Sequence, residues 1–107
     1  MRQWDRYDYK DLIDTGAYVL RFGSQWCKPC HKLGVYLTAN EQRYPHLDFI
    51  EIDGETCASV VALSHVEAYP TTLLMVNGEE QGRFEGLPKE HTLEQILTAW
   101  NELVGAL

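Results

Sequence analysis

The sequence predicts an α/β fold in which a mixed sheet of four or five strands carries helices on both faces. Three observations support this prediction. Short apolar segments alternate with segments of helical periodicity, an order that favours parallel strands joined by right-handed crossovers. An Asn-Gly pair late in the chain marks a hairpin, which adds an antiparallel part. A strongly amphipathic segment closes the chain. Because 107 residues are near the commonest domain size, we expect residues 1–107 to form a single domain.

Composition limits the partners that the protein can have. Apolar residues make up 45% of the chain and charged residues 23%, which is typical of a folded domain with a modest core. The net charge of −7 argues against nucleic acids and anionic membranes, since both select basic surfaces. No apolar stretch is long enough to span a bilayer, and the polar N-terminus lacks a signal-peptide pattern. We therefore expect a cytoplasmic monomer with no membrane or nucleic-acid partner.

The first half of the chain is predicted to contain two helices and two strands in alternation. Residues 5–15 have a weak amphipathic pattern of helical period. The apolar run at residues 17–22 suits a buried strand. From residue 27 to about 42 the apolar side chains recur at helical spacing, and Pro45 ends this helix. Residues 47–53 alternate between apolar and polar side chains, which indicates a second strand.

The second half adds a helix, a hairpin and a closing helix. Residues 55–66 look helical, and residues 71–76 form an apolar run that predicts a third strand. Asn77-Gly78 follows, and both residues tolerate a positive φ, so the charged segment 80–86 is expected to return as an edge strand.

The closing helix has the clearest helical pattern in the sequence. Thr92-x-x-Gln95 has the form of a capping box, so we expect the helix to begin there. Its apolar residues fall on one face at helical spacing. They are Leu93, Ile96, Leu97, Trp100, Leu103 and Val104.

Two of the three cysteines lie in the segment Trp26-Cys27-Lys28-Pro29-Cys30, at the predicted junction of a strand and a helix. The unpaired N–H groups and the positive dipole end of the helix stabilise a thiolate there, and Lys28 adds a positive charge. Both effects lower the pKa of Cys27 from its ordinary value of about 8.5. The spacing brings Cys30 within reach of Cys27, and Pro29 stiffens the turn. The pair can therefore attack a disulfide with Cys27 and resolve the product with Cys30.

Two other chemistries use the same cysteines. Cys-x-x-Cys-His, ending here at His31, is the attachment motif for a c-type haem, with Met75 as an axial ligand. That reaction requires export, and the sequence shows no signal peptide. Two cysteines beside a histidine are also half of a zinc site, but the other candidate ligands are scattered singly. These candidates are Cys57, His46, His65 and His91. We therefore rank the redox pair first and expect no metal and no bound cofactor.

Residues 26–30 resemble the W-C-x-P-C active site of the thioredoxin family. A second stretch, AYPTTLLMVNGEEQGRFEG, is similar to the family segment in which a cis-proline precedes a buried strand, an Asn-Gly hairpin and a final glycine. Pro70 matches the cis-proline, and Gly86 matches the glycine that lines the substrate groove. The resemblance extends over about residues 8–105 and implies the thioredoxin-like fold.

The resemblance also implies an activity, namely the reduction of protein disulfides in cell redox homeostasis. Cys27 would be the nucleophile and Cys30 the resolving thiol. Electrons would come from a thioredoxin reductase or a similar donor, and the Cys27–Cys30 disulfide would be the redox-active group. The substrate chain would add in strand fashion to the backbone of Tyr69. The residues that would shape the site and its groove are Trp26, Lys28, Pro29, Tyr69, Pro70 and Gly86.

Some positions depart from the family pattern. Arg21 replaces the usual buried Asp below the resolving cysteine, and Phe49 replaces the Lys that accompanies it. An Arg cannot act as a base at neutral pH. If Arg21 points inward it can favour the Cys30 thiolate, with Glu51 or Asp53 as its partner; otherwise it extends to the surface.

Two further departures affect the surroundings of the site. Gly23 replaces a second large aromatic residue, and the first strand of the family is shortened or lost. Two other functions therefore stay open beside the reductase. One is an interaction module that binds partners in the groove with little redox turnover, and the other is a variant biased towards oxidation or isomerisation.

Overall fold

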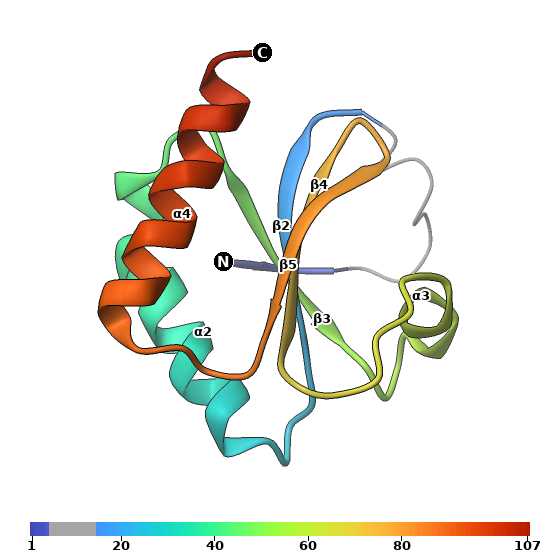
Figure 1. Ribbon diagram of the computed structural model, residues 1–107. Coiled ribbons are helices and arrows are strands. Elements are labelled where there is room, and N and C mark those ends of the chain that lie inside the picture. The colour runs from blue at the N-terminus through green and yellow to red at the C-terminus, as the bar shows by residue number, and fades with distance from the viewer. Residues whose placement is uncertain (5–14) are drawn as a thin grey trace.

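A five-stranded mixed sheet forms the centre of the fold (Figure 1). The computed structural model describes residues 1–4 and 15–107. Its strands are β1 (Arg2–Gln3), β2 (Ala17–Gly23), β3 (Asp48–Asp53), β4 (Thr71–Val76) and β5 (Glu79–Glu85). Its helices are α2 (Lys28–Asn40), α3 (Ala58–Leu63) and α4 (Glu90–Gly105), with a 3₁₀ turn η1 (Glu41–Arg43).

The strand order is β1-β3-β2-β4-β5. Strand β3 pairs in parallel with β1 and with β2, whereas β4 pairs antiparallel with β2 and β5. Helices α2 and α4 lie on one side of this sheet and α3 on the other (Figure 1). The predicted α/β architecture, with helices on both faces, is confirmed, and the sheet has five strands. The first strand is shortened to two residues and is not lost.

Alternation along the strands divides the core into two clusters. Neighbouring residues of a strand point to opposite faces, so Val19 packs on the α2/α4 side and Leu20 on the α3 side. The α3 side is built from Trp4, Leu20, Phe22, Ile50, Ile52, Cys57, Val60, Val66, Leu73 and Met75. The other side is built from Val19, Leu33, Leu37, Tyr44, Leu47, Phe49, Leu74, Val76, Leu93 and Leu97.

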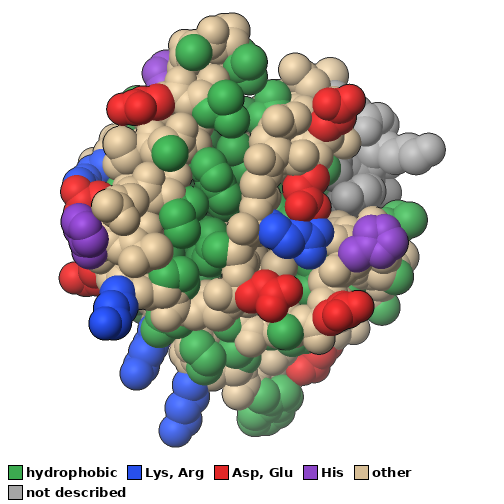
Figure 2. Space-filling model, in the orientation of Figure 1, with side chains coloured by type: hydrophobic (Ala, Val, Ile, Leu, Met, Phe, Trp, Pro, Cys, Tyr) green, Lys and Arg blue, Asp and Glu red, His purple; other side chains and the backbone are tan. Residues whose placement is uncertain are grey.

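The seam between α4 and β5 continues the second cluster to the surface. The rings of Phe84 on β5 and Trp100 on α4 pack with their centroids 5.7 Å apart. Figure 2 shows apolar side chains filling the space between these two elements. Helix α4 is thereby fixed to the edge of the sheet through its predicted apolar face.

The predicted strands agree with the structure to within two residues at each end, but the helices differ more. The helix predicted over 55–66 is only α3, a little under two turns. The helix predicted from residue 27 ends at Asn40 and continues as η1 before Pro45. The helix predicted over 5–15 falls in the segment 5–14, which lies outside the described residues. Within the described residues, no helix has both the length and the apolar character needed to cross a bilayer.

The hairpin and the last helix illustrate one correct and one wrong prediction. Asn77 and Gly78 have φ values of 49° and 83° and join β4 to β5, as expected of an Asn-Gly hairpin. The capping box is wrong, because α4 already begins at Glu90 and Thr92 lies in its first turn. Its N-cap is Lys89, whose carbonyl accepts a bond from the amide of Leu93 (2.9 Å) and whose side chain caps nothing. Burial of Leu93 sets the position of this turn, and the dipole favours acidic Glu90 there.

Candidate active site

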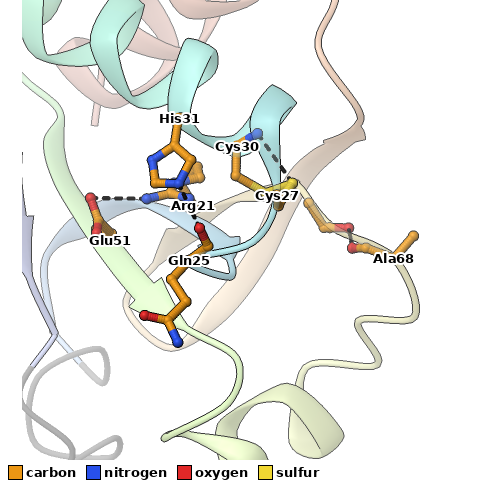
Figure 3. Close-up of a disulfide and its surroundings, with 8 residues drawn as sticks. Arg21, Gln25, Cys27, Cys30, His31, Glu51 and Ala68 are labelled. Carbon is orange, nitrogen blue, oxygen red and sulfur yellow. Dashed lines mark hydrogen bonds and ion pairs between the residues drawn. A yellow bond between two sulfur atoms is a disulfide. The ribbon is translucent and has the colours of Figure 1, made fainter.

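The connection from β2 to α2 places two cysteines at one edge of the sheet. Cys27 is the N-cap of α2, and its Sγ accepts a hydrogen bond from the amide of Cys30 (3.2 Å). The two residues form a disulfide with their Cα atoms 5.2 Å apart (Figure 3). Cys27 is half-buried, whereas Cys30 is completely buried against the sheet. Cys27 is therefore the more accessible of the two cysteines.

The residues around Cys27 face solvent. Lys28 and Pro29 are exposed in the first turn of α2, where a missing N–H group costs nothing. Trp26 is 80% exposed, so it projects from the surface and is not packed tightly against the disulfide. His31 Nε2 lies 2.9 Å from the carbonyl oxygen of Gln25, a hydrogen bond that fixes the loop before the helix.

A second segment reaches the same sheet edge. Strand β4 runs antiparallel to β2, with Thr71 opposite Phe22, so the residues before β4 lie beside the residues after β2. The Tyr69–Pro70 peptide bond is cis, as the resemblance implies. The amide of Gly86 donates to the carbonyl of Pro70 (2.8 Å), which brings the end of β5 to the same place. Gly86 has a φ of 76°, a conformation that favours glycine.

Tyr69 links this edge to the turn after β3. Its ring lies against Gly54, where any side chain would overlap the phenol. Burial raises the pKa of Tyr69, and the carboxylates of Asp53 and Glu55 raise it further. The ring is still 36% exposed, so Tyr69 contributes both a wall and an accessible face to the site.

Arg21 occupies the space below Cys30. It points inward, is 6% exposed, and forms an ion pair with Glu51 (Arg21 Nη2 to Glu51 Oε2, 2.9 Å; Figure 3). An ideal Cβ at Gly23 would overlap Nη1 of Arg21 and would lie 3.0 Å from Sγ of Cys30. The guanidinium and the buried sulfur therefore flank the space that Gly23 leaves empty. Of the two candidate partners, Glu51 and Asp53, it is Glu51 that pairs with Arg21.

The remaining candidates lie away from the cysteine pair. Phe49 is buried in the cluster below α2 and α4, and Cys57 is buried in the cluster on the α3 side and carries no disulfide. Among residues 1–4 and 15–107, no three His, Cys, Asp or Glu side chains gather in a group that could hold a metal ion.

Sequence reasoning missed the structural part played by Gly34. This residue lies inside α2, where glycine costs about 1 kcal/mol relative to alanine. It adjoins Arg21: an ideal Cβ there would lie 3.9 Å from Nη2. A glycine within a helix often has a packing reason, but an added Cβ at Gly34 would make only ordinary contacts. What could not be seen was that the neighbour is a guanidinium.

A disulfide at the start of a helix, next to a cis-proline at the edge of a mixed sheet, defines the class of thiol–disulfide oxidoreductases. Comparison with known proteins agrees, since the Thioredoxin family model matches residues 3–99. The chain belongs to the thioredoxin family. As in that family, its Cys-x-x-Cys active site makes it a protein-disulfide reductase.

Individual relatives are distant but cover most of the chain. Human thioredoxin is 31% identical over 99 residues, which cover 90% of this chain and 90% of that protein. Thioredoxin H-type 1 of Nicotiana tabacum is 29% identical over 97 residues, or 91% of this chain and 77% of the relative. The oxidised mitochondrial thioredoxin 3 of Saccharomyces cerevisiae superposes with a TM-score of 0.76 at 27% identity, covering 86% of this chain and 87% of that one.

Proposed function

We propose that Cys27 is the nucleophile and Cys30 the resolving thiol in the reduction of disulfides in other proteins. The observation that carries this assignment is the difference in burial within one disulfide. Cys27 is half-buried at the N-cap of α2, whereas Cys30 is 0% exposed. The helix start favours a thiolate on Cys27, and only a neighbour within the protein can be reached by Cys30.

The reaction proceeds in two exchanges. The Cys27 thiolate attacks one sulfur of the substrate disulfide, whose S–S bond breaks, and the departing thiolate takes up a proton. The Cys30 thiolate then attacks Sγ of Cys27 in the mixed disulfide. The Cys27–Cys30 disulfide forms and the second substrate thiol leaves. Two electrons pass to the substrate, and the dithiol is oxidised to the disulfide.

The substrate groove that we propose is formed by three loops at one sheet edge. Tyr69 and Pro70 precede β4, Gly86 follows β5, and Trp26 precedes Cys27. An extended substrate backbone would lie along Tyr69 and Pro70 and pair with main-chain groups, as an added strand does. Exposed apolar side chains at this end support docking of a protein, and Figure 2 shows apolar side chains along its lower edge. The exposed ones are Trp26, Tyr69 and Leu87.

The partners and the setting are part of the same proposal. A thioredoxin reductase, or a similar donor, returns the disulfide to the dithiol, and no further cofactor takes part. Residues 1–107 act as one monomeric domain in the cytoplasm, without a membrane or nucleic-acid partner. The single sheet that joins the described segments supports the one-domain assignment, and the free thiol of Cys57 suits a reducing compartment.

Reduction of insulin in the presence of dithiothreitol tests the assignment. The wild type is expected to accelerate insulin precipitation, and Cys27→Ser is expected to leave only the uncatalysed rate, because no other thiol reaches the substrate. Cys57→Ser is the matched control and should keep the wild-type rate. Full activity in Cys27→Ser would refute the proposed nucleophile.

A further inference from the structure

We propose that Arg21, held by Glu51, is a positioning residue that stabilises the thiolate of Cys30 in the resolving step. The family's usual residue at this position is a carboxylate that can accept a proton, and here a guanidinium that cannot do so takes its place. The inference rests on the resolving role proposed for Cys30. It concerns how that thiol is made reactive, and not whether the pair exchanges disulfides.

The sheet brings the charges together below the cysteine. Strands β2 and β3 are parallel, with Arg21 directly opposite Glu51, so both side chains leave the sheet on the face covered by α2. Gly23 leaves room for the guanidinium next to Cys30, because a Cβ there would overlap Nη1 of Arg21. Nη1 borders the same empty space as Sγ of Cys30, and Nη2 reaches Glu51.

The two side chains of the ion pair differ in their exposure to solvent. This difference decides the sign of the electrostatic field at Sγ of Cys30. The Arg21 side chain is 7% exposed, whereas that of Glu51 is 40% exposed. Solvent screens the carboxylate, but it scarcely reaches the guanidinium. The carboxylate also lies on the side of Arg21 away from the cysteines (Figure 3). Of these two charges, the positive one therefore lies nearer to Cys30, and it favours the deprotonated sulfur. His31 and Asp53 also line the cavity beside Cys30.

Arg21 also has one hydrogen-bond donor that is not paired. Its Nε is buried and has no hydrogen-bond partner within the described part of the chain. A buried N–H group without an acceptor is costly, and buried charges are normally paired on all sides. In the disulfide state the sulfur of Cys30 carries no charge. Reduction followed by loss of a proton creates an anion near Nη1 of this guanidinium, whose Nε has no acceptor of its own.

A cavity provides the exit for the proton. It has a volume of about 690 Å³, and its lining includes Arg21, Cys30, His31 and Glu51. The space is open to solvent, so water in it can carry the proton away from Cys30, and the step needs no buried base. The thiolate then attacks Sγ of Cys27, forming one S–S bond and breaking another. The released substrate thiolate is protonated from solvent.

The test measures the ionisation of Cys30 in variants that remove either the positive charge of Arg21 or the negative charge of Glu51. In a Cys27→Ala/Cys57→Ala background, Cys30 is the only thiol, and the ultraviolet absorbance of its thiolate, followed against pH, gives the midpoint of its ionisation without a reagent having to reach the buried sulfur. Arg21→Gln should raise this midpoint by about one pH unit, a tenfold loss of thiolate at fixed pH. Arg21→Lys should restore most of it.

Glu51→Gln should shift the midpoint the other way, because the guanidinium then acts without its counter-charge. Lys32→Gln removes an exposed positive charge from the same helix and is the matched control, expected to leave the midpoint unchanged. Opposite shifts for the two partners cannot arise from a general loosening of the fold. Midpoints that stay fixed, or that move in the same direction in both variants, would overturn the inference. If Arg21→Gln does not fold, the Glu51→Gln variant decides alone, since Glu51 is half-exposed: a Cys30 midpoint that fails to fall would overturn the inference.

A kinetic readout separates this inference from the proposed function. In chains with both active-site cysteines, Arg21→Gln should slow release of substrate from the mixed disulfide about tenfold at neutral pH and recover at higher pH. If Cys27→Ser is inactive but Arg21→Gln releases substrate at the wild-type rate, the reductase assignment stands and the role of Arg21 falls. If Cys27→Ser is fully active, the assignment of the nucleophile itself fails.

Discussion

At the scale of single residues, two glycines border the guanidinium of Arg21, but only Gly23 sets how closely Arg21 and Cys30 approach each other. Gly23 has no room for a side chain, because a Cβ would overlap Nη1 of Arg21 and press on the cysteine. Gly34 faces the same guanidinium from the helix but has ordinary contact distances, 3.6 Å to Met1 Cε and 3.9 Å to Arg21 Nη2. The two positions therefore differ in what an added methyl group would do.

Alanine at these two positions should change stability in opposite directions. Gly23→Ala is expected to lower the free energy of unfolding by about 1–3 kcal/mol, because the buried guanidinium of Arg21 must shift. Gly34→Ala is expected to raise it by up to about 1 kcal/mol, because alanine suits a helix better and space is available. Urea denaturation of the oxidised proteins measures both. A Gly23→Ala variant as stable as the wild type would show that the guanidinium moves freely.

At the scale of elements, the sequence predicts what depends on local pattern and misses what depends on packing. The strands follow from short apolar runs, from alternation at residues 47–53 and from the Asn77-Gly78 turn, which need only neighbouring residues. Helix α3 is shorter than its apolar pattern suggests. Its first residue follows Cys57, which is buried in the core, and a chain reversal at His65, with a φ of 54°, follows its end. No local pattern could reveal that reversal.

The start of α4 gives a prediction at the same scale. Lys89 is an N-cap in extended conformation without a capping side chain, and its charge opposes the helix dipole. Lys89→Ser should therefore stabilise the protein by about 0.5–1 kcal/mol, because serine can accept a bond from an unpaired amide. Thr92→Ala is the control and should change stability little, since Thr92 is exposed inside the first turn. Thermal unfolding distinguishes this outcome from the sequence-based one, in which Thr92→Ala would be the costly change.

At the scale of the whole molecule, the strand order assembles the site. Residues that follow β2, precede β4 and follow β5 are far apart in the sequence, yet they meet at one edge because β2, β4 and β5 are neighbours. The cysteine pair and the cis-proline could be predicted, since each belongs to a recognisable motif. The inward orientation of Arg21 could not, because the sequence does not show whether a long cationic side chain enters the core or reaches solvent.

The capture of a substrate on Cys27 tests the central claim most directly. A Cys30→Ser/Cys57→Ser protein should attack a disulfide-bonded substrate but fail to resolve the product, so a covalent complex should accumulate. Mass spectrometry of its peptides is predicted to locate the bond at Cys27, and dithiothreitol should release both chains. Absence of any adduct on Cys27, under conditions where the wild type reduces the same substrate, would contradict the account.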